Sequence, residues 1–204
     1  MDQEVYEKLI SIRENQDLTL RPTPHLKTTF TGFDGQEHPL VLRYYQVQGI
    51  LHLVAMNKFL LGDDTGLGKT IQSIAALCYL WEKNPDLKAI ILTNKSAVGQ
   101  WAREFEKFSL GVTTFTCKGT VKQRKKTLDQ FKESEGPSVV IMGYRSAVRD
   151  IGELHSLTDY VLITDEATAF KNSKTQVHQT VAHLAGNAKR VWALTATLIK
   201  NNLI

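Results

Sequence analysis

Residues 59–71 read FLLGDDTGLGKTI, and the rest of the domain can be placed around them. The apolar run Phe59 to Leu61 is followed by a glycine-rich loop and then by an apolar-periodic stretch that begins at Ile71. This order predicts a strand, a loop and the start of a helix. Glycines let a backbone approach a phosphate closely, and the N–H groups and dipole at a helix start favour negative charge. The stretch therefore predicts a cradle for a triphosphate.

Two residues of this loop carry the expected phosphate chemistry. Lys69 would reach the β and γ oxygens of the triphosphate, and the Thr70 hydroxyl would bind Mg²⁺. The strict pattern G-x-x-x-x-G-K-[ST] is not met, because Asp63 stands where the first glycine belongs and Gly62 lies one residue earlier. A glycine turn before an ordinary helix is the structural alternative, and the predicted strand and helix on either side argue against it.

Composition sets wide limits on the class of protein. The chain has 204 residues, 42% of them hydrophobic, which is enough for the core of one domain with an N-terminal appendage. A net charge of +4 fits a polyanionic partner but also fits many soluble enzymes. The two cysteines, Cys78 and Cys117, are too few for a disulfide framework or a zinc site, and the histidines show no ligand spacing. The sequence contains no membrane-length apolar run and no signal-like start, so we expect a soluble intracellular protein.

Residues 1–40 are predicted to be an N-terminal accessory segment. Val5, Leu9 and Ile12 recur at helical spacing, which indicates a short amphipathic helix. Prolines and glycines then interrupt the pattern, and residues 33–36 are typical of a tight turn between two short extended pieces.

From residue 41 onward, short apolar strands alternate with helices. We expect strands at 59–61, 89–93, 112–117, 138–142, 159–164 and 190–194. We expect helices at 42–54, 70–81, 98–108 with Ser96 as its cap, 121–133 and 173–184. This alternation predicts an α/β domain in which a mainly parallel sheet carries helices on both faces.

Ligands of such folds bind at the carboxyl ends of the strands. Five segments are expected to meet along that edge: residues 62–70, Thr93, Gly143, residues 165–166 and residues 195–197. Asp165 can hold the Mg²⁺ that bridges the β and γ phosphates, and Glu166 can orient or deprotonate the attacking water. An isolated Asp-Glu pair at a strand end is more often structural, but its combination with the GLGKT loop favours a catalytic pair.

The chain resembles the first, RecA-like lobe of a Swi/Snf-type ATPase, within helicase superfamily two. The resemblance rests on six segments in order: 42–46 with Gly49, 63–70, 91–101, 139–144, 165–168 and 194–203. They are similar to the family's adenine-reading motif, its D-E-M-G-L-G-K-T loop, and its V-V-I-T-T-Y, D-E-A-H and L-T-G-T-P-I-Q-N-N-L motifs. The segment 91–101, which reads I-L-T-N-K-S-A-V-G-Q-W here, also resembles the family. The resemblance implies a RecA-like P-loop lobe at residues 41–204, part of an ATP-hydrolysing motor that moves along duplex DNA.

The resemblance also implies a role for individual residues at the nucleotide. Gln46 would contact adenine, for which its amide offers both a donor and an acceptor. Lys69 would contact phosphate, Thr70 and Asp165 would bind Mg²⁺, and Glu166 would act on the attacking water. The remaining nucleotide contacts would come from Asp64, Thr65, Gly66, Leu67 and Gly68.

A second set of residues is implied for the polynucleotide. Contacts to the DNA backbone would come from Lys95, Ser96, Gln100, Tyr144 and Arg145. Thr195 and Thr197 would couple the nucleotide pocket to the bound DNA. A basic cluster at residues 118–126 is also a candidate phosphate contact, but a solvated helix face is favoured there, because Asp129 can pair with Lys125. Trp101 and Trp192 lie in apolar-periodic segments and are expected to pack in the core rather than stack on bases.

Some residues depart from the family pattern. Asp64 and Thr65 replace Glu-Met, and Thr168 replaces the histidine of D-E-A-H, which puts the coupling to a second lobe in doubt. The last motif is altered at Ala196, Leu198 and Lys200. The phosphate lysine, the metal ligands and the glutamate are all retained.

Motors of this superfamily bind ATP between two lobes, and the second lobe supplies an arginine to the transition state. The chain has no room for that lobe, so we expect a piece of a longer protein that binds nucleotide weakly and hydrolyses it slowly. Two alternatives stay open: a nucleotide-gated DNA- or protein-docking module without turnover, and an RNA-acting or strand-separating helicase of the same superfamily.

Overall fold

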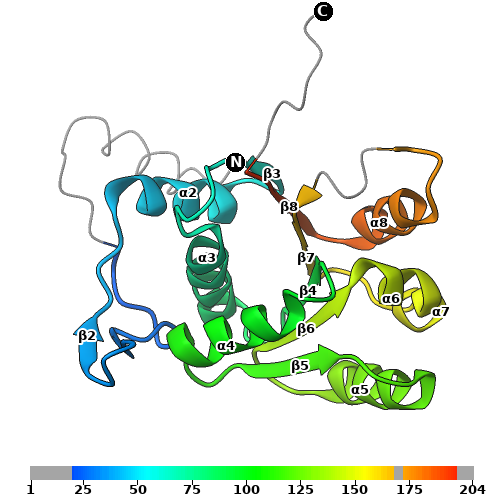
Figure 1. Cartoon of the computed structure of the whole chain (residues 1–204), viewed down its shortest axis with the longest axis horizontal. Helices are drawn as coiled ribbons and strands as arrows, with labels where there is room; N and C mark the ends of the chain where they lie inside the picture. The colour runs from blue at the N-terminus through cyan, green and yellow to red at the C-terminus, as the bar shows by residue number, and fades with distance from the viewer. Residues whose placement is uncertain (1–19, 168–171, 197–204) are drawn as a thin grey trace, which may run out of the picture.

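A central sheet lies between two layers of helices in the computed structural model, which describes residues 20–167 and 172–196 (Figure 1). The sheet has six strands in the order β3-β8-β7-β4-β6-β5, and all of its pairings are parallel. The strands are β3 (Lys58–Leu61), β4 (Lys88–Thr93), β5 (Thr113–Cys117), β6 (Ser138–Gly143), β7 (Val161–Asp165) and β8 (Arg190–Leu194). The predicted α/β class with a parallel sheet is confirmed.

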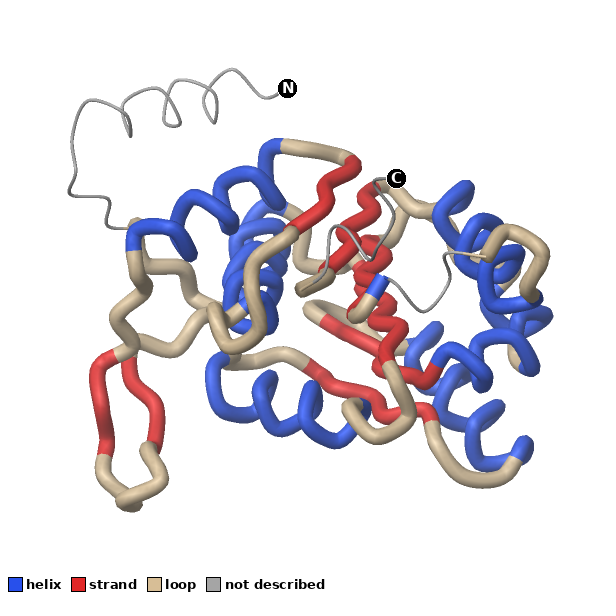
Figure 2. The backbone as a smooth tube through the Cα atoms, turned by 45° about the horizontal axis from the view of Figure 1, so that its top comes forward, coloured by secondary structure: helices blue, strands red, loops and turns tan. Residues whose placement is uncertain are grey.

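The helices divide between the two faces of the sheet, as Figures 1 and 2 show. One face is covered by α2 (Tyr44–Ala55), α3 (Lys69–Lys83) and α4 (Val98–Phe108). The other is covered by α5 (Val121–Glu133), α6 (Tyr144–Arg149), α7 (Ile151–Leu154) and α8 (Gln176–Asn187). No helix among the described residues is both long enough and apolar enough to cross a membrane.

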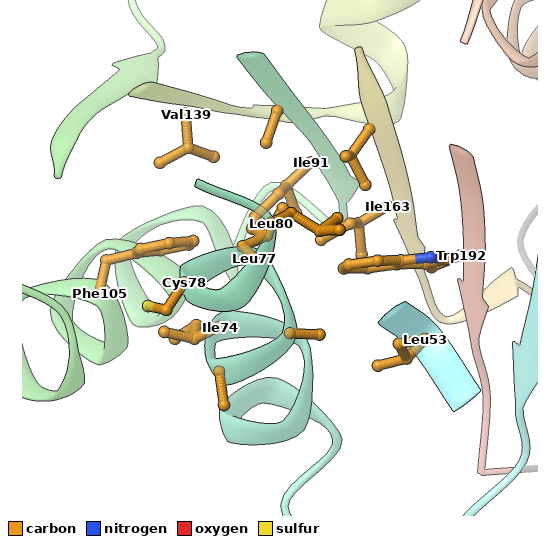
Figure 3. Packing of buried hydrophobic residues seen from close by; sticks show 14 of the residues in the cluster. Leu53, Ile74, Leu77, Cys78, Leu80, Ile91, Phe105, Val139, Ile163 and Trp192 are labelled. Carbon is orange, nitrogen blue, oxygen red and sulfur yellow. The ribbon is translucent and has the colours of Figure 1, made fainter. Parts of the chain in front are cut away.

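Both faces of the central strands are buried, which explains their continuous apolar sequences. Ala89 and Ile91 of β4 belong to the core under α3, whereas Ile90 and Leu92 belong to the core under the other layer. Trp192 lies in the first of these cores with side chains of α3, β4 and β7 (Figure 3). Fully burying an aliphatic or aromatic side chain of this kind contributes about 1.5–3 kcal/mol.

The two cysteines are buried on opposite faces of the sheet, Cys78 on α3 and Cys117 at the end of β5. Burial raises the pKa of each thiol to about 12. Both thiols are therefore protonated and unreactive at neutral pH, as expected of packing residues.

The expected strands and long helices lie within a few residues of their predicted positions, but three details differ. Helices α6 and α7 were not predicted, because six and four residues are too short for a periodic pattern to emerge. The cap of α4 was also wrong. Residues 94–97 form a turn in which the Ala97 N–H donates to the Asn94 carbonyl at 2.9 Å, so Ala97 and not Ser96 is the N-cap.

The described part of the N-terminal region packs against the end of α4. Strands β1 (Thr29–Thr31) and β2 (Glu37–Pro39) form an antiparallel hairpin, which confirms the predicted turn at residues 33–36. The Lys27 N–H donates to the Phe108 carbonyl at 2.8 Å, and the Leu110 N–H donates to the His25 carbonyl at 2.8 Å. The helix expected around residues 5–12 lies outside the described residues, and the domain boundary at residue 40 stays a prediction.

A buried ion pair fixes α5 to the junction of α6 and α7. Arg124 donates from Nε and Nη2 to the two carboxylate oxygens of Asp150 at 2.6 and 2.9 Å, and from Nη1 to the Gly119 carbonyl at 2.9 Å. The two side chains are 5% and 7% exposed. The pairing expected between Lys125 and Asp129 was wrong, because Lys125 reaches across to Glu153 of α7 at 2.7 Å.

We expect Asp150→Ala to lower the free energy of unfolding by about 3–5 kcal/mol, because it leaves the Arg124 guanidinium buried without its counter-charge. Urea denaturation followed by circular dichroism measures the effect. Glu153→Ala is the matched control, since it removes a partly exposed carboxylate that pairs with Lys125 and Lys132 on the same helix layer, and it should cost much less. Equal losses in the two variants would contradict a special role for the buried pair.

Candidate nucleotide site

The carboxyl ends of the parallel strands lie along one edge of the sheet, as expected for a ligand site. Strands β3, β4, β6, β7 and β8 end at Leu61, Thr93, Gly143, Asp165 and Leu194, so the described parts of all five predicted segments follow a strand along this edge. Leu194 pairs with Leu61 on one side and with Asp165 on the other. The glycine loop and the acidic pair therefore start from strands that flank β8, about 10 Å apart across the sheet.

The glycine loop has the backbone that a phosphate cradle requires. Gly66 and Gly68 have φ angles of +83° and +80°, a left-handed conformation that favours glycine. No heavy atom lies within 4 Å of the position that a Cβ would take at Gly66, so the loop is open there. Gly68 is the N-cap of α3 and provides no side-chain cap. The first N–H groups of α3 have no acceptor within the helix, and an anion can bind them.

Lys69 begins α3 and is turned back onto its own loop. Its ammonium donates to the carbonyl oxygens of Asp63 at 2.7 Å and Asp64 at 3.0 Å. The lysine side chain thus bonds the start of α3 back to the first residues of the glycine loop. Its contact with phosphate stays a prediction.

Two glutamines on the neighbouring helices α2 and α3 form hydrogen bonds to the glycine loop. Gln46 of α2 accepts from the Arg43 N–H at 2.9 Å and donates to the Leu67 carbonyl at 3.2 Å. Gln72 of α3 is fully buried and donates to a carboxylate oxygen of Asp63 at 2.8 Å. Gln46 therefore lies against the loop, and both ends of its amide bond to the protein itself. Its contact with adenine stays a prediction.

Sequence reasoning missed Gln72 and the use of Asp63. The signal was available, because Gln72 lies between Ile71 and the apolar run that starts at Ile74, and Asp63 breaks the strict glycine pattern. Together they show that the departure at residue 63 serves the structure, since its carboxylate accepts the buried amide of Gln72.

Asp165 is held by side chains of three neighbouring segments, two at its carboxylate and one at its backbone carbonyl. Its Oδ2 accepts from Thr93 Oγ1 at 2.9 Å and from Trp101 Nε1 at 2.8 Å, while its carbonyl oxygen accepts from the Tyr144 hydroxyl at 2.7 Å. Trp101 and Trp192 are both buried in the core as expected. The hydrogen bond from the Trp101 indole to Asp165 was not foreseen, because residue spacing does not reveal it.

Glu166, the expected catalytic residue, has a φ of +57°, which is uncommon for a side chain other than glycine. Conformations of this kind concentrate at functional sites. Tyr144 lies close to this turn. Burial, followed by the nearby carboxylates of Asp165 and Glu166, holds the pKa of the Tyr144 hydroxyl well above its usual value, so it stays a neutral donor to the Asp165 carbonyl.

A groove of about 640 Å³ runs along the same edge, beside β4 and β6. Its basic lining residues are Lys95, Lys118, Arg124, Arg145 and Arg149. Of the predicted DNA contacts, Lys95 and Arg145 line the groove and are exposed, and Ser96 and Gln100 are exposed on the adjoining turn and helix. Tyr144 does not fit that expectation, because it is only 6% exposed and its hydroxyl bonds inward to Asp165.

The basic cluster at residues 118–126 proves to be mixed. Lys118 lines the groove, and Arg124 is buried in its pair with Asp150. The other lysines of the cluster, Lys122, Lys125 and Lys126, are exposed. The prediction of a solvent-exposed helix face was thus right for these α5 lysines and wrong for Arg124.

The predicted coupling residues are only partly described. Thr195 is buried, and its N–H donates to the Leu61 carbonyl at 3.1 Å, which ties the end of β8 to the strand before the glycine loop. Thr197 and the altered positions Thr168, Leu198 and Lys200 lie outside the described residues.

Comparisons with known proteins agree with this geometry. A sequence model described as the SNF2-related domain matches residues 45–204. The chain is 32% identical over 167 residues to the chromodomain-helicase-DNA-binding protein 1-like of Mus musculus, a match that covers 79% of this chain and 18% of that protein. It is also 32% identical over 167 residues to the nuclear protein STH1/NPS1 of Saccharomyces cerevisiae, covering 79% of this chain and 12% of that protein.

A solved structure shares the fold. The Sulfolobus solfataricus SWI2/SNF2 ATPase core in complex with dsDNA superposes with a TM-score of 0.69 at 25% identity, covering 92% of this chain and 36% of that chain. The present chain therefore spans less than a fifth of the curated relatives named above and about a third of that core.

We expect Gly49→Ala to loosen the glycine loop, because a Cβ at this buried position of α2 would overlap the Gln72 side-chain oxygen and displace the amide from Asp63. The free energy of unfolding should fall by about 1–3 kcal/mol. Gly186→Ala is the control, since the same change in α8 meets no atom within 4 Å and should stabilise the helix by up to about 1 kcal/mol. Urea denaturation of both variants tests this, and a Gly49→Ala protein as stable as the wild type would contradict it.

Proposed function

Because this chain belongs to the SNF2-related family, we propose that it is the ATP-binding lobe of a motor that hydrolyses ATP to move along duplex DNA. The observation that carries the proposal is the pairing of Leu194 with both Leu61 and Asp165, which sets the glycine loop and the acidic pair on one edge. A basic groove continues along that edge. Nucleotide and polynucleotide would thus bind side by side.

The residues present fit Mg·ATP. The left-handed glycines and the start of α3 offer N–H groups to phosphate oxygens, and Lys69 would exchange its two carbonyl acceptors for them. Thr70 and Asp165 offer the hydroxyl and carboxylate oxygens that Mg²⁺ prefers. When bound, Mg²⁺ would neutralise charge on the β and γ phosphates.

Gln46 would contact adenine only after a change of partners. Its amide donates to the Leu67 carbonyl, and its oxygen accepts from the Arg43 N–H. Adenine offers a donor and an acceptor of its own, so one or both of these bonds would pass to the base. Glu166 would take a proton from the attacking water, a role of general base that typically contributes about 10²–10⁴-fold to the rate.

The groove is proposed to contact the DNA backbone. Lys95, Gln100 and Arg145 keep the role inferred from the family resemblance, and Lys118 and Arg149 join them as exposed cations. Duplex DNA carries regularly spaced phosphates, and neutralising them releases counterions, so affinity should fall steeply with salt. That the bound polynucleotide is duplex DNA rests on the resemblance to the SWI2/SNF2 ATPase core in complex with dsDNA.

Hydrolysis is proposed to need a second lobe that faces this edge and supplies an arginine to the transition state. The support is the length of the relatives, of which the matched regions are a small part. The 204-residue chain alone is then expected to bind Mg·ATP and to turn it over slowly.

Substitutions at the loop and at the acidic pair separate binding from chemistry. In the 204-residue chain, Lys69→Ala should weaken Mg·ATP binding by about tenfold or more, because a charge-assisted contact is lost, whereas Glu166→Gln should bind normally. In a longer protein that includes the second lobe, Glu166→Gln should reduce DNA-stimulated hydrolysis by about 10²–10⁴-fold. Lys122→Ala, an exposed change on α5 away from the groove, serves as the control.

Binding is measured by titration with a fluorescent ATP analogue, and turnover by phosphate release with duplex DNA, single-stranded DNA or RNA as the stimulator. If the longer protein shows no DNA-stimulated turnover, the motor proposal is wrong and a binding module without turnover is favoured. Stronger stimulation by RNA or by single strands would reassign the polynucleotide.

A further inference from the structure

The three side chains that hold Asp165 share a second property: each is next, or next but one, to a predicted DNA contact in the sequence. Thr93 is followed by Asn94 and Lys95, Trp101 directly follows Gln100, and Tyr144 directly precedes Arg145. The holding residues are 0%, 2% and 6% exposed, whereas all four of their neighbours are exposed. At three separate places, then, a predicted groove contact and a residue that bonds to Asp165 lie only one or two positions apart in the sequence.

The segments that carry these residues also lie against one another. A Cβ built at Gly143, the residue before Tyr144, would lie 3.5 Å from the Cα of Lys95, an ordinary packing distance. Strands β4 and β6, which lead into the two segments, are paired along their whole length up to Thr93 and Gly143. Because at most one residue separates each groove contact from a residue that holds Asp165, a displacement of the groove wall would be carried directly to the bonds on Asp165.

We propose that Thr93, Trp101 and Tyr144 are positioning residues that connect the DNA groove to Asp165, the first two through its carboxylate and Tyr144 through its backbone carbonyl. The inference rests on the proposed function and goes beyond it by assigning the physical link between the two ligands. Two donors converge on Oδ2 of Asp165, and the described residues place no hydrogen-bond donor on Oδ1. The donors fix the orientation of the carboxylate, and hydrogen bonds to a metal ligand of this kind commonly change metal affinity or activity by about 10–100-fold.

The link predicts a mutual effect of the two ligands on each other. If DNA contacts at Lys95, Gln100 and Arg145 shift the groove wall, the orientation of Asp165 changes, and the affinity for Mg·ATP changes with it. By thermodynamic linkage, Mg·ATP must change the affinity for DNA by the same factor, typically about 5–150-fold in coupled sites. ATP without Mg²⁺ should show a much smaller effect, because the coupling acts through the metal ligand.

Three substitutions remove one hydrogen bond each and keep most of the packing: Thr93→Val, Trp101→Phe and Tyr144→Phe. Trp192→Phe is the matched control, because Trp192 is also fully buried in the same core as Trp101, but its Nε1 has no hydrogen-bond partner among the described residues. Loss of an indole N–H at residue 192 should therefore cost no bond. Urea denaturation confirms that each variant is folded.

The experiment uses the 204-residue chain and measures the dissociation constant of Mg·ATP without and with a saturating short DNA duplex, and that of the duplex without and with Mg·ATP. We expect the wild type and Trp192→Phe to show the same coupling factor, whether it is measured on the affinity for Mg·ATP or on the affinity for the duplex. Each of the three substitutions should lower the coupling factor by about tenfold, or to near 1 where the wild-type factor is itself below about ten. For Thr93→Val and Trp101→Phe, the duplex affinity without nucleotide should stay unchanged. The Mg²⁺ concentration needed for half-maximal ATP binding should rise by about tenfold or more.

The outcomes separate the link from the proposed function. If Mg·ATP and duplex both bind, but the wild type shows no coupling or the variants keep all of it, the link is wrong and the proposed function stands. If the wild type binds neither ligand, the proposed function fails and the link fails with it. Should Trp101→Phe not fold, the smaller changes Thr93→Val and Tyr144→Phe decide the question by the same readout. A variant that loses stability but retains full coupling would show that these bonds are structural only.

Discussion

The parallel pairing of β8 with both β3 and β7 is the constraint on which the rest of the site depends. Because Leu194 lies between Leu61 and Asp165, the glycine loop and the acidic turn leave the sheet at the same level. A shift of one residue in either register would turn every side chain of the shifted strand to the opposite face of the sheet. The two apolar cores, one on each face, penalise any such shift, so the geometry of the edge is set by the packing of residues that never contact a ligand.

Much of this arrangement follows from local sequence pattern. The apolar strands, the glycine loop and Asp165 at a strand end could be placed by periodicity alone, and the rule that parallel strands share one carboxyl edge brought them together. Short helices such as α6 and α7 left no such pattern. The cap of α4 was misplaced because Ser96 is a good cap by residue type, whereas the turn that starts at Asn94 delays the helix.

Polar contacts between residues far apart in the sequence could not be predicted from residue spacing. Arg124 and Asp150 are far apart in sequence, as are Trp101 and Asp165, and each pair forms only because separate elements meet in the fold. Tyr144 shows a related limit, because the family resemblance implied a DNA contact there, whereas its hydroxyl bonds inward to Asp165. The replacement of the first loop glycine by Asp63 is explained only by its hydrogen bond from Gln72, which the structure shows.

The self-contained bonding of the glycine loop has a thermodynamic consequence. Lys69 bonds to two carbonyls of its own loop, and Gln46 and Gln72 brace it from behind, so the cradle keeps its shape before a ligand arrives. A preorganised receptor loses little conformational entropy on association. The enthalpy gained is correspondingly reduced, because bonds already satisfied within the loop must be exchanged rather than newly made. Binding of the proposed nucleotide at this edge would therefore exchange hydrogen-bond partners in a preformed loop rather than order a flexible segment.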